Sequence, residues 1–139
     1  MKPDTAEWVS KAEGDFRTAQ REIAASDCPN FDAACFHAQQ CAEKYLKARL
    51  VEAEVSYPKI HDLAALLRLV LPLEPSWTFL EESLDLLTSM GVEVRYPGMT
   101  ADAEDATEAV RLAARVRETV RRALEVECRA TVPTDEGKM

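Results

Sequence analysis

The sequence predicts an all-α protein that folds as an up-and-down bundle of four to five antiparallel helices. Three observations favour this fold class: glycines are few, at 4 in 139 residues, alanine and leucine are abundant, and no stretch alternates apolar and polar residues long enough to form a strand. A chain of this length with 47% hydrophobic residues can bury one core without disulfides or metals. We therefore expect a single domain over residues 1–139, with its core at about 5–127 and a disordered tail at 130–139.

The first predicted helix runs from Asp4 or Thr5, either of which could cap it, to about Ala25. Residues 28–30 then break the chain, and a second helix follows from about 31 to 52 or 53. Apolar residues of the first helix recur every three or four positions, which defines a stripe that faces the core. The stripe consists of Trp8, Ala12, Phe16, Ala19 and Ile23.

Three further helices are predicted in the second half of the chain. The third begins near residues 61–62 and ends at Pro72, and the fourth opens with a capping-box sequence at 78–81 and stops at Gly91. A long last helix spans about 102–128. The residues expected to face inward are Leu63, Leu66, Leu67 and Val70, then Leu80, Leu84 and Leu87, and finally Ala106, Val110, Ala113, Val120 and Leu124.

No apolar run is long enough to form a signal peptide or to cross a membrane, and the longest, at about 66–73, is interrupted by Arg68. We therefore expect a cytoplasmic protein without a membrane partner. The cysteines show neither a Cys-x-x-Cys pair nor the spacing of zinc ligands, so we expect reduced thiols, no metal and no cofactor. The cysteines are Cys28, Cys35, Cys41 and Cys128.

The net charge of -8 argues against a protein that binds polyanions indiscriminately, because such binding depends on Lys and Arg that release counterions. The acidic excess is concentrated in residues 74–110, which carry 1 basic and 9 acidic groups. On the last helix, Arg111, Arg115 and Arg122 alternate with glutamates, which is typical of a solvated, self-paired face. A site for a phosphate or a short RNA would therefore have to be built from particular side chains.

The second helix carries two neighbouring patterns. One is a stripe of apolar and small residues that should pack the bundle, and the other is a row that is apolar at its ends and polar in its middle. This row is either a half-exposed face with an ordinary ion pair between Glu43 and Lys47, or an interface for a second subunit, a partner or a ligand. The stripe consists of Phe31, Cys35, Ala38, Ala42, Tyr45 and Leu46, and the row of Phe36, Gln40, Glu43, Lys47 and Leu50.

Four features, taken in order, resemble the HEPN domains, whose name abbreviates "higher eukaryotes and prokaryotes nucleotide-binding". They are Trp8, Ala12 and Asp15 on the first helix, FHAQQCAEKYLKARL at 36–50, His61-Asp62-Leu63, and Arg95-Tyr96-Pro97-Gly98. The resemblance covers about residues 5–127. It implies a helical bundle that commonly forms homodimers and takes a nucleotide or RNA as ligand. It also implies a minimal nucleotidyltransferase as a partner in a two-component system of the toxin–antitoxin type.

The resemblance also raises the question of catalysis, because many HEPN proteins are metal-independent ribonucleases with an Arg-x(4-6)-His motif. In this chain His37 and His61 both precede Arg95, and residues 100–102 stand where the motif would place its histidine. The motif is therefore absent in its usual form, and we expect a binding module rather than an enzyme. A ribonuclease would need folding to bring His61 or His37 beside Arg95; His61 is the candidate, because His37 is expected to be exposed.

Four residues are candidates for contact with a ligand. Arg95 could bind a phosphate or neutralise a neighbouring carboxylate such as Glu93, and Tyr96 could stack on a base or fill a gap beside the core. His61 could contact the ligand or orient the start of the third helix. Lys47, in the mixed row of the second helix, is the fourth candidate.

Overall fold

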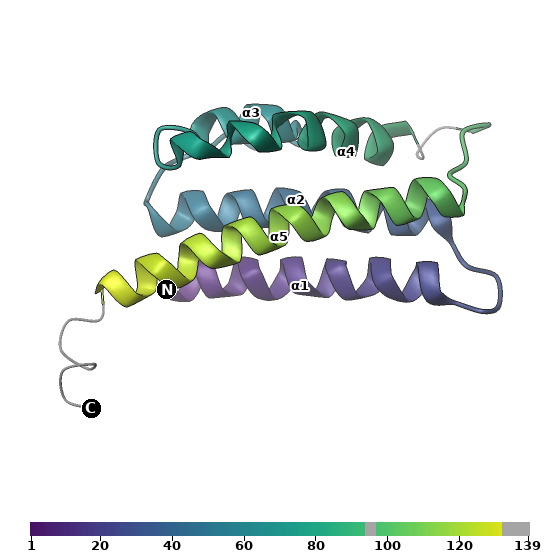
Figure 1. The fold of residues 1–139 in the computed structure, drawn as a ribbon, viewed down its shortest axis with the longest axis horizontal. Helices are drawn as coiled ribbons and strands as arrows, with labels where there is room; N and C mark the ends of the chain where they lie inside the picture. The colour runs from purple at the N-terminus through teal and green to yellow at the C-terminus, as the bar shows by residue number, and fades with distance from the viewer. Residues whose placement is uncertain (94–96, 132–139) are drawn as a thin grey trace.

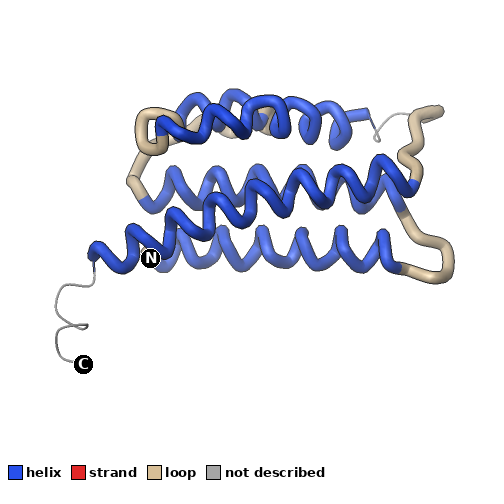
Figure 2. Tube along the Cα trace, in the orientation of Figure 1, coloured by secondary structure: helices blue, strands red, loops and turns tan. Residues whose placement is uncertain are grey.

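The computed structural model describes residues 1–93 and 97–131, and in these ranges the chain forms five α-helices, one short 3₁₀ helix and no strand. Helix α1 runs antiparallel to α2, and α4 runs antiparallel to α2 and α5, whereas α2 and α5 run in the same direction (Figures 1 and 2). The predicted all-α bundle is confirmed. The elements are α1 (Pro3–Ala24), α2 (Phe31–Glu52), α3 (Leu63–Val70), η1 (Pro75–Leu80), α4 (Glu81–Glu93) and α5 (Ala103–Thr131).

Helix α2 lies at the centre of the bundle. It packs against α1 on one side, against α3 and α4 on another, and against α5, which lies in front of it in Figure 1. None of the 22 residues of α2 is exposed. Ala34, Ala38, Ala42 and Ala48 are completely buried, and their small side chains allow the neighbouring helices to approach closely.

Helix α1 begins differently from the prediction, which placed Asp4 or Thr5 at its cap. The cap residue is Lys2, whose side chain makes no capping hydrogen bond, and Pro3 occupies the first turn. Proline suits this position because its fixed φ angle is close to that of a helix and its missing N–H would have no partner there. The predicted core stripe is confirmed for Ala12, Phe16 and Ala19, with Trp8 and Ile23 partly buried.

The start of α3 follows the prediction, because the Asp62 side chain accepts hydrogen bonds from the backbone N–H groups of Ala64 and Ala65. The fourth helix does not. A 3₁₀ helix at residues 75–80 precedes it in place of the expected capping box, and α4 continues through Gly91 to Glu93.

Gly91 is buried inside α4, where it faces Gln39 of α2. A Cβ atom at residue 91 would lie 2.8 Å from both Cβ and Cγ of Gln39. Gly91 is therefore required by close helix packing and does not terminate the helix. The predicted inward-facing residues of α3, α4 and α5 are all buried, as the sequence indicated.

Helix α5 extends to Thr131, so residues 130 and 131 of the expected tail are helical, and the rest of that tail, 132–139, lies outside the described residues. None of the helices in the described ranges is long and apolar enough to cross a membrane. Cys35 and Cys41 are buried free thiols, whereas Cys28 is exposed in the turn between α1 and α2.

Candidate functional site

A buried carboxylate on α2, Glu43, joins two of the predicted ligand-binding residues. Only 3% of Glu43 is exposed. Lys47 Nζ donates to its Oε2 at 2.9 Å, and His61 Nδ1 lies 2.9 Å from its Oε1. Burial opposes the ionisation of Glu43, but the hydrogen bonds from Lys47 and His61 outweigh it and hold the pKa of Glu43 below its ordinary value. The charged carboxylate therefore orders both side chains.

Lys47 is enclosed on three sides. Its ammonium lies 5.5 Å from the ring centroids of Trp8 and Tyr57, in addition to its ion pair with Glu43, and only 8% of the residue is exposed. Cation–π contacts of this kind stabilise a partly desolvated ammonium. Lys47 therefore holds α1, α2 and the connection to α3 together, which leaves little of its charge for a ligand.

His61, by contrast, is 67% exposed at its side chain. Because the ionised Glu43 accepts from Nδ1, the proton of the neutral ring lies on Nδ1, and Nε2 is an acceptor on the edge that faces solvent. The backbone carbonyl of His61 accepts from Gln39 Nε2 at 3.3 Å, and Gln40 Nε2 donates to Gln39 Oε1 at 2.8 Å. The ring is thus presented to solvent in a fixed position.

A second cluster of the same composition lies between α1 and α2. Asp15 accepts from Lys44 Nζ at 2.5 Å, and its other oxygen lies 2.7 Å from His37 Nδ1. His37 also meets the ring of Phe36 edge-on, with 5.3 Å between centroids. The expectation of an exposed His37 was therefore wrong, because this histidine is half-buried and bonded to a carboxylate.

The structure also corrects the expected exposure of the mixed row on α2. Glu43, Lys47 and Leu50 are buried within the monomer, so this half of the row is not open to a second subunit. The physical reason is that two residues of the connection between α2 and α3 cover this part of α2: Tyr57 contacts Lys47, and His61 contacts Glu43. Phe36 and Gln40 are half-buried, and their role in an interface stays a prediction.

Two predicted ligand residues, Arg95 and Tyr96, lie outside the described residues. Tyr57 was not predicted as a site residue. It lies in the connection between α2 and α3, outside any helix, so no helical periodicity marks it. Sequence reasoning also missed the link between Asp15 and α2, although an aspartate within the apolar stripe of α1 could have indicated a buried partner.

A pocket of about 310 Å³ lies between the start of α1 and the end of α2. It is next to the cluster of Glu43, Lys47 and His61, here called the Glu43 cluster, because Trp8 and Tyr57 line the pocket and also contact Lys47. Its volume is within the range of small-molecule sites. Its walls carry two aromatic rings, one cation and two carboxylates, which together can stack on a planar ring and hydrogen-bond to its edges. The lining residues are Asp4, Glu7, Trp8, Lys11, Val51 and Tyr57.

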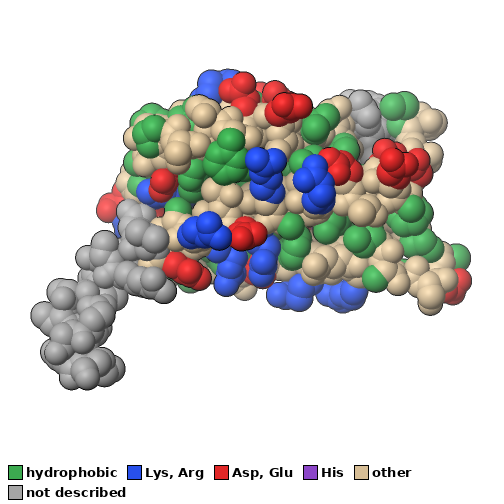
Figure 3. All heavy atoms as spheres, in the orientation of Figure 1, with side chains coloured by type: hydrophobic (Ala, Val, Ile, Leu, Met, Phe, Trp, Pro, Cys, Tyr) green, Lys and Arg blue, Asp and Glu red, His purple; other side chains and the backbone are tan. Residues whose placement is uncertain are grey.

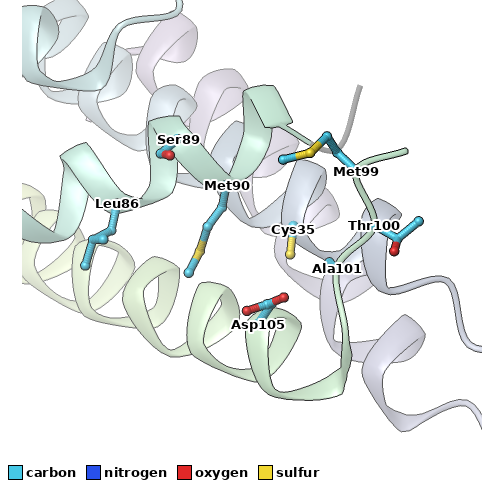
Figure 4. Close-up of a pocket in the computed structure, with 8 residues that line it drawn as sticks. All are labelled: Cys35, Leu86, Ser89, Met90, Met99, Thr100, Ala101 and Asp105. Carbon is cyan, nitrogen blue, oxygen red and sulfur yellow. The ribbon is translucent and has the colours of Figure 1, made fainter. Parts of the chain in front are cut away.

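Another side of the molecule, formed by α4, α5 and the neighbouring η1 and called here the α4–α5 side, exposes large hydrophobic side chains. Phe79, Leu86 and Met99 are all exposed there, and Figure 3 shows hydrophobic side chains among the charged ones on this face. A second pocket, of about 260 Å³, lies between α4, α5 and the segment that joins them (Figure 4). It is lined by Cys35, Leu86, Ser89, Met90, Met99, Thr100, Ala101 and Asp105.

The thiol in this second pocket is not suited to nucleophilic chemistry. Burial, and then the charges of Asp105, Asp32 and Asp102, raise the pKa of Cys35 to about 11. Cys35 is therefore protonated at neutral pH, and the pocket offers apolar contact rather than a reactive group. Among the residues that the structure describes, no three His, Cys, Asp or Glu side chains are grouped so as to hold a metal ion.

Comparison with known proteins places these features in a family. The model of the HEPN domain matches residues 5–123. The crystal structure of TT1696 from Thermus thermophilus is similar at a TM-score of 0.71 and 27% identity, covering 87% of this chain and 98% of that one. An archaeal HEPN homologue, ST0689, shares the fold at a TM-score of 0.69 and 24% identity, covering 88% and 98%. No curated protein matches the chain.

Proposed function

Because the chain belongs to the HEPN domain family, we propose that it is a module that binds a nucleotide or an RNA element. The observation that carries the proposal is the Glu43 cluster, which fixes the exposed ring of His61 and the ring of Tyr57 on one side of the bundle. The solvent-facing Nε2 of His61 can accept a hydrogen bond from an amino group at a base edge. Aromatic rings beside it stack on bases of any sequence.

The pocket beside the cluster supports the same ligand class. Trp8 and Tyr57 both line it, so a base entering the pocket meets two aromatic side chains. Asp4 and Glu7 accept hydrogen bonds from amino groups, and Lys11 supplies a positive charge for a phosphate. The mixture of rings, acceptors and one cation fits a nucleotide better than a wholly apolar ligand.

Calorimetric titration with ATP, other nucleotides and short RNAs tests this proposal. The wild-type protein is expected to bind at least one of them, and Tyr57→Ala is expected to weaken binding about fivefold or more, since stacking contributes about 1–3 kcal/mol per base. Phe79→Ala is the matched control, because Phe79 is an exposed ring on the α4–α5 side. Absence of binding, or equal losses in both variants, would contradict the proposal.

The ribonuclease alternative is favoured by one observation, the geometry of His61. A carboxylate on Nδ1 and a solvent-facing Nε2 suit a general base, which could remove the proton of a 2′-hydroxyl. Its other predicted residue, Arg95, lies outside the described residues. This function requires metal-independent RNA cleavage that disappears in Arg95→Ala, and cleavage that survives the change or depends on added metal would remove it.

Pairing with another protein is a second proposal, supported by the exposed Phe79, Leu86 and Met99 on the α4–α5 side. The partner is a second copy of the chain or a minimal nucleotidyltransferase. Light scattering of the protein, alone and mixed with such a nucleotidyltransferase, distinguishes the two partners. Leu86→Glu should abolish whichever complex forms. A complex that Leu86→Glu leaves intact would exclude this face as the interface.

A further inference from the structure

A row of arginines follows the edge where α1 and α5 meet. Glu13 of α1 fixes the two helices relative to each other, because Arg117 of α5 donates to it twice, at 2.6 Å and 2.9 Å. Arg121, one turn further along α5, lies 3.9 Å from Glu13, and its Nη1 donates to the Tyr45 hydroxyl at 3.4 Å. These contacts place two guanidinium groups beside one carboxylate.

Two more arginines continue the row along α1. Arg17 and Arg21 come one and two helical turns after Glu13, on the same side of the helix. Because α1 and α5 run in opposite directions (Figure 1), this pair extends away from Glu13 while Arg121 extends the other way. A step of four residues rises about 6 Å, so Arg121, Arg117, Arg17 and Arg21 follow one another over about 18 Å. Figure 3 shows basic side chains gathered along this edge.

The charges of this row are largely free. Arg17 and Arg21 are exposed and form no ion pair with a described residue, and 32% and 40% of the Arg117 and Arg121 side chains are exposed. Glu13 neutralises one charge, and the exposed Glu125 is the nearest acidic residue beyond Arg121 along α5. The edge therefore carries a local positive excess on a chain whose net charge is -8.

Two members of the row are also held in place. The Arg117 guanidinium stacks 4.9 Å from the centroid of the Phe16 ring while its Nε and Nη2 bind Glu13. Arg121 is held by Tyr45, to which its Nη1 donates. Burial, and the hydrogen bond to Glu13, raise the pKa of Tyr45, so its phenol remains protonated and donates to Glu13. Arginines that are ordered before binding lose less conformational entropy when they bind a phosphate.

We propose that Arg17, Arg21, Arg117 and Arg121, here called the arginine ridge, bind the phosphodiester backbone of a short single-stranded nucleic acid. The length of the ridge matches about five nucleotides of a stacked strand at about 3.4 Å each. Guanidinium groups recognise phosphate oxygens through paired hydrogen bonds. The negative charge elsewhere on the chain repels a polyanion and so confines it to the ridge. This inference rests on the proposed nucleic-acid ligand and assigns it a second, separate contact surface.

The test is fluorescence anisotropy with a labelled eight-nucleotide oligo(U) RNA and the matching DNA strand over a series of salt concentrations. The double variant Arg17→Gln/Arg21→Gln is expected to weaken binding by about tenfold at low salt. It should also reduce the slope of log K against log salt by about 1.4, which is about 0.7 for each lost phosphate contact. Because Arg17 and Arg21 are exposed, this variant should keep the melting temperature of the wild type.

The matched control is Arg111→Gln/Arg115→Gln, which removes the same charge from another side of α5. Arg111 already pairs with Glu108, and Arg115 lies over the Phe79 ring. This control should bind as the wild type does. Equal losses in the two double variants would show an effect of net charge alone and would overturn the ridge.

The remaining outcomes separate the ridge from the proposed function. If the wild-type protein binds mononucleotides in calorimetry but neither eight-nucleotide strand, the proposed function is supported and the role of the arginine ridge in binding nucleic acid is contradicted. Binding to neither class of ligand removes both. Equal affinity for the RNA and DNA strands supports recognition through phosphates alone, and tighter RNA binding supports the ridge with an added contact to the 2′-hydroxyl.

Discussion

Two regions of the molecule carry ionic clusters. One is where α2 meets α1 and the connection to α3, and the other is the edge between α1 and α5; they differ in which charged groups remain exposed. In the first region each carboxylate, Glu43 of α2 or Asp15 of α1, binds one lysine and one histidine, and the lysines are buried or half-buried. At the α1–α5 edge a single carboxylate, Glu13, serves two arginines that remain partly exposed. The first arrangement holds the fold together, and the second presents charge to solvent.

This difference shows that the number of charges does not locate a binding surface. The paired residues Arg111 and Glu108, or Arg122 and Glu118, cancel one another on the exposed side of α5, as the sequence indicated. The arginine ridge differs because its residues come from two helices and outnumber the carboxylates beside them. Pairing and burial, taken residue by residue, decide which charges can act on a ligand.

The largest expected effect comes from breaking the buried cluster on α2. Glu43→Leu leaves the enclosed ammonium of Lys47 without its partner, which should lower the free energy of unfolding by about 3–5 kcal/mol. Urea denaturation measures this loss. The double variant Glu43→Leu/Lys47→Leu should recover most of the loss, because two apolar residues can replace a buried ion pair. A double variant as unstable as the single one would contradict the ion pair as the cause.

A smaller loss is expected where α4 supports the same cluster. Gly91→Ala forces a Cβ against Gln39, and overpacking of this kind costs about 1–3 kcal/mol. Gly14→Ala is the control, because a Cβ there meets nothing within 4 Å and alanine favours a helix by about 0.5–1 kcal/mol. Thermal unfolding should therefore show opposite shifts for the two variants, and equal shifts would contradict the close contact.

The response to acid should connect the two regions. Hydrogen bonding to Arg117 lowers the pKa of Glu13, and the hydrogen bonds of Lys47 and His61 lower that of Glu43 against the effect of burial. The unfolded chain therefore takes up protons first, near the ordinary value of 4.5. Stability should be fully present above this pH and fall as the pH drops toward the folded values. Unfolding of Glu13→Gln and Glu43→Gln should depend less on pH below 4.5, and unchanged slopes would contradict these assignments.

The smallest effect is expected from the exposed pair on α5. Glu118→Gln removes the partner of Arg122, at 3.0 Å, from a well-solvated position. Such pairs contribute about 0–1 kcal/mol, so urea denaturation should give nearly the wild-type stability. A loss as large as that of Glu43→Leu would show that burial is not what separates the two kinds of ion pair.

The fold was predictable because periodic leucines and alanines record which face of each helix is buried. The inward-facing sets of α3, α4 and α5 were all found buried. The stop expected at Gly91 was wrong because local preference for a helix end competes with tertiary packing, and here close contact with Gln39 explains the glycine. The cap expected at Asp4 or Thr5 was wrong for a different, local reason, since Pro3 already starts the helix.

The candidate site was less predictable, because its contacts join residues far apart in the chain. Glu13 and Arg117 are separated by 104 positions, so no local sequence pattern could predict their contact. The mixed row of α2 could not be assigned from its own sequence, since the covering residues, Tyr57 and His61, belong to the next connection. The ion pair of Glu43 with Lys47 was one of the alternatives that the sequence left open, whereas the contact of His61 with the same carboxylate is evident only in the folded chain.

The most direct test of the central claim, that this HEPN module binds a nucleic acid through ordered side chains on these surfaces, is an NMR titration of the labelled protein with the eight-nucleotide RNA. Binding of the RNA should shift the signals of Trp8 and Tyr57, which line the pocket beside the Glu43 cluster, and of Arg17 and Arg117 on the arginine ridge. Signals of the α4–α5 side, at Leu86, should stay in place. No shifts, or shifts largest on that side, would contradict binding at these two surfaces.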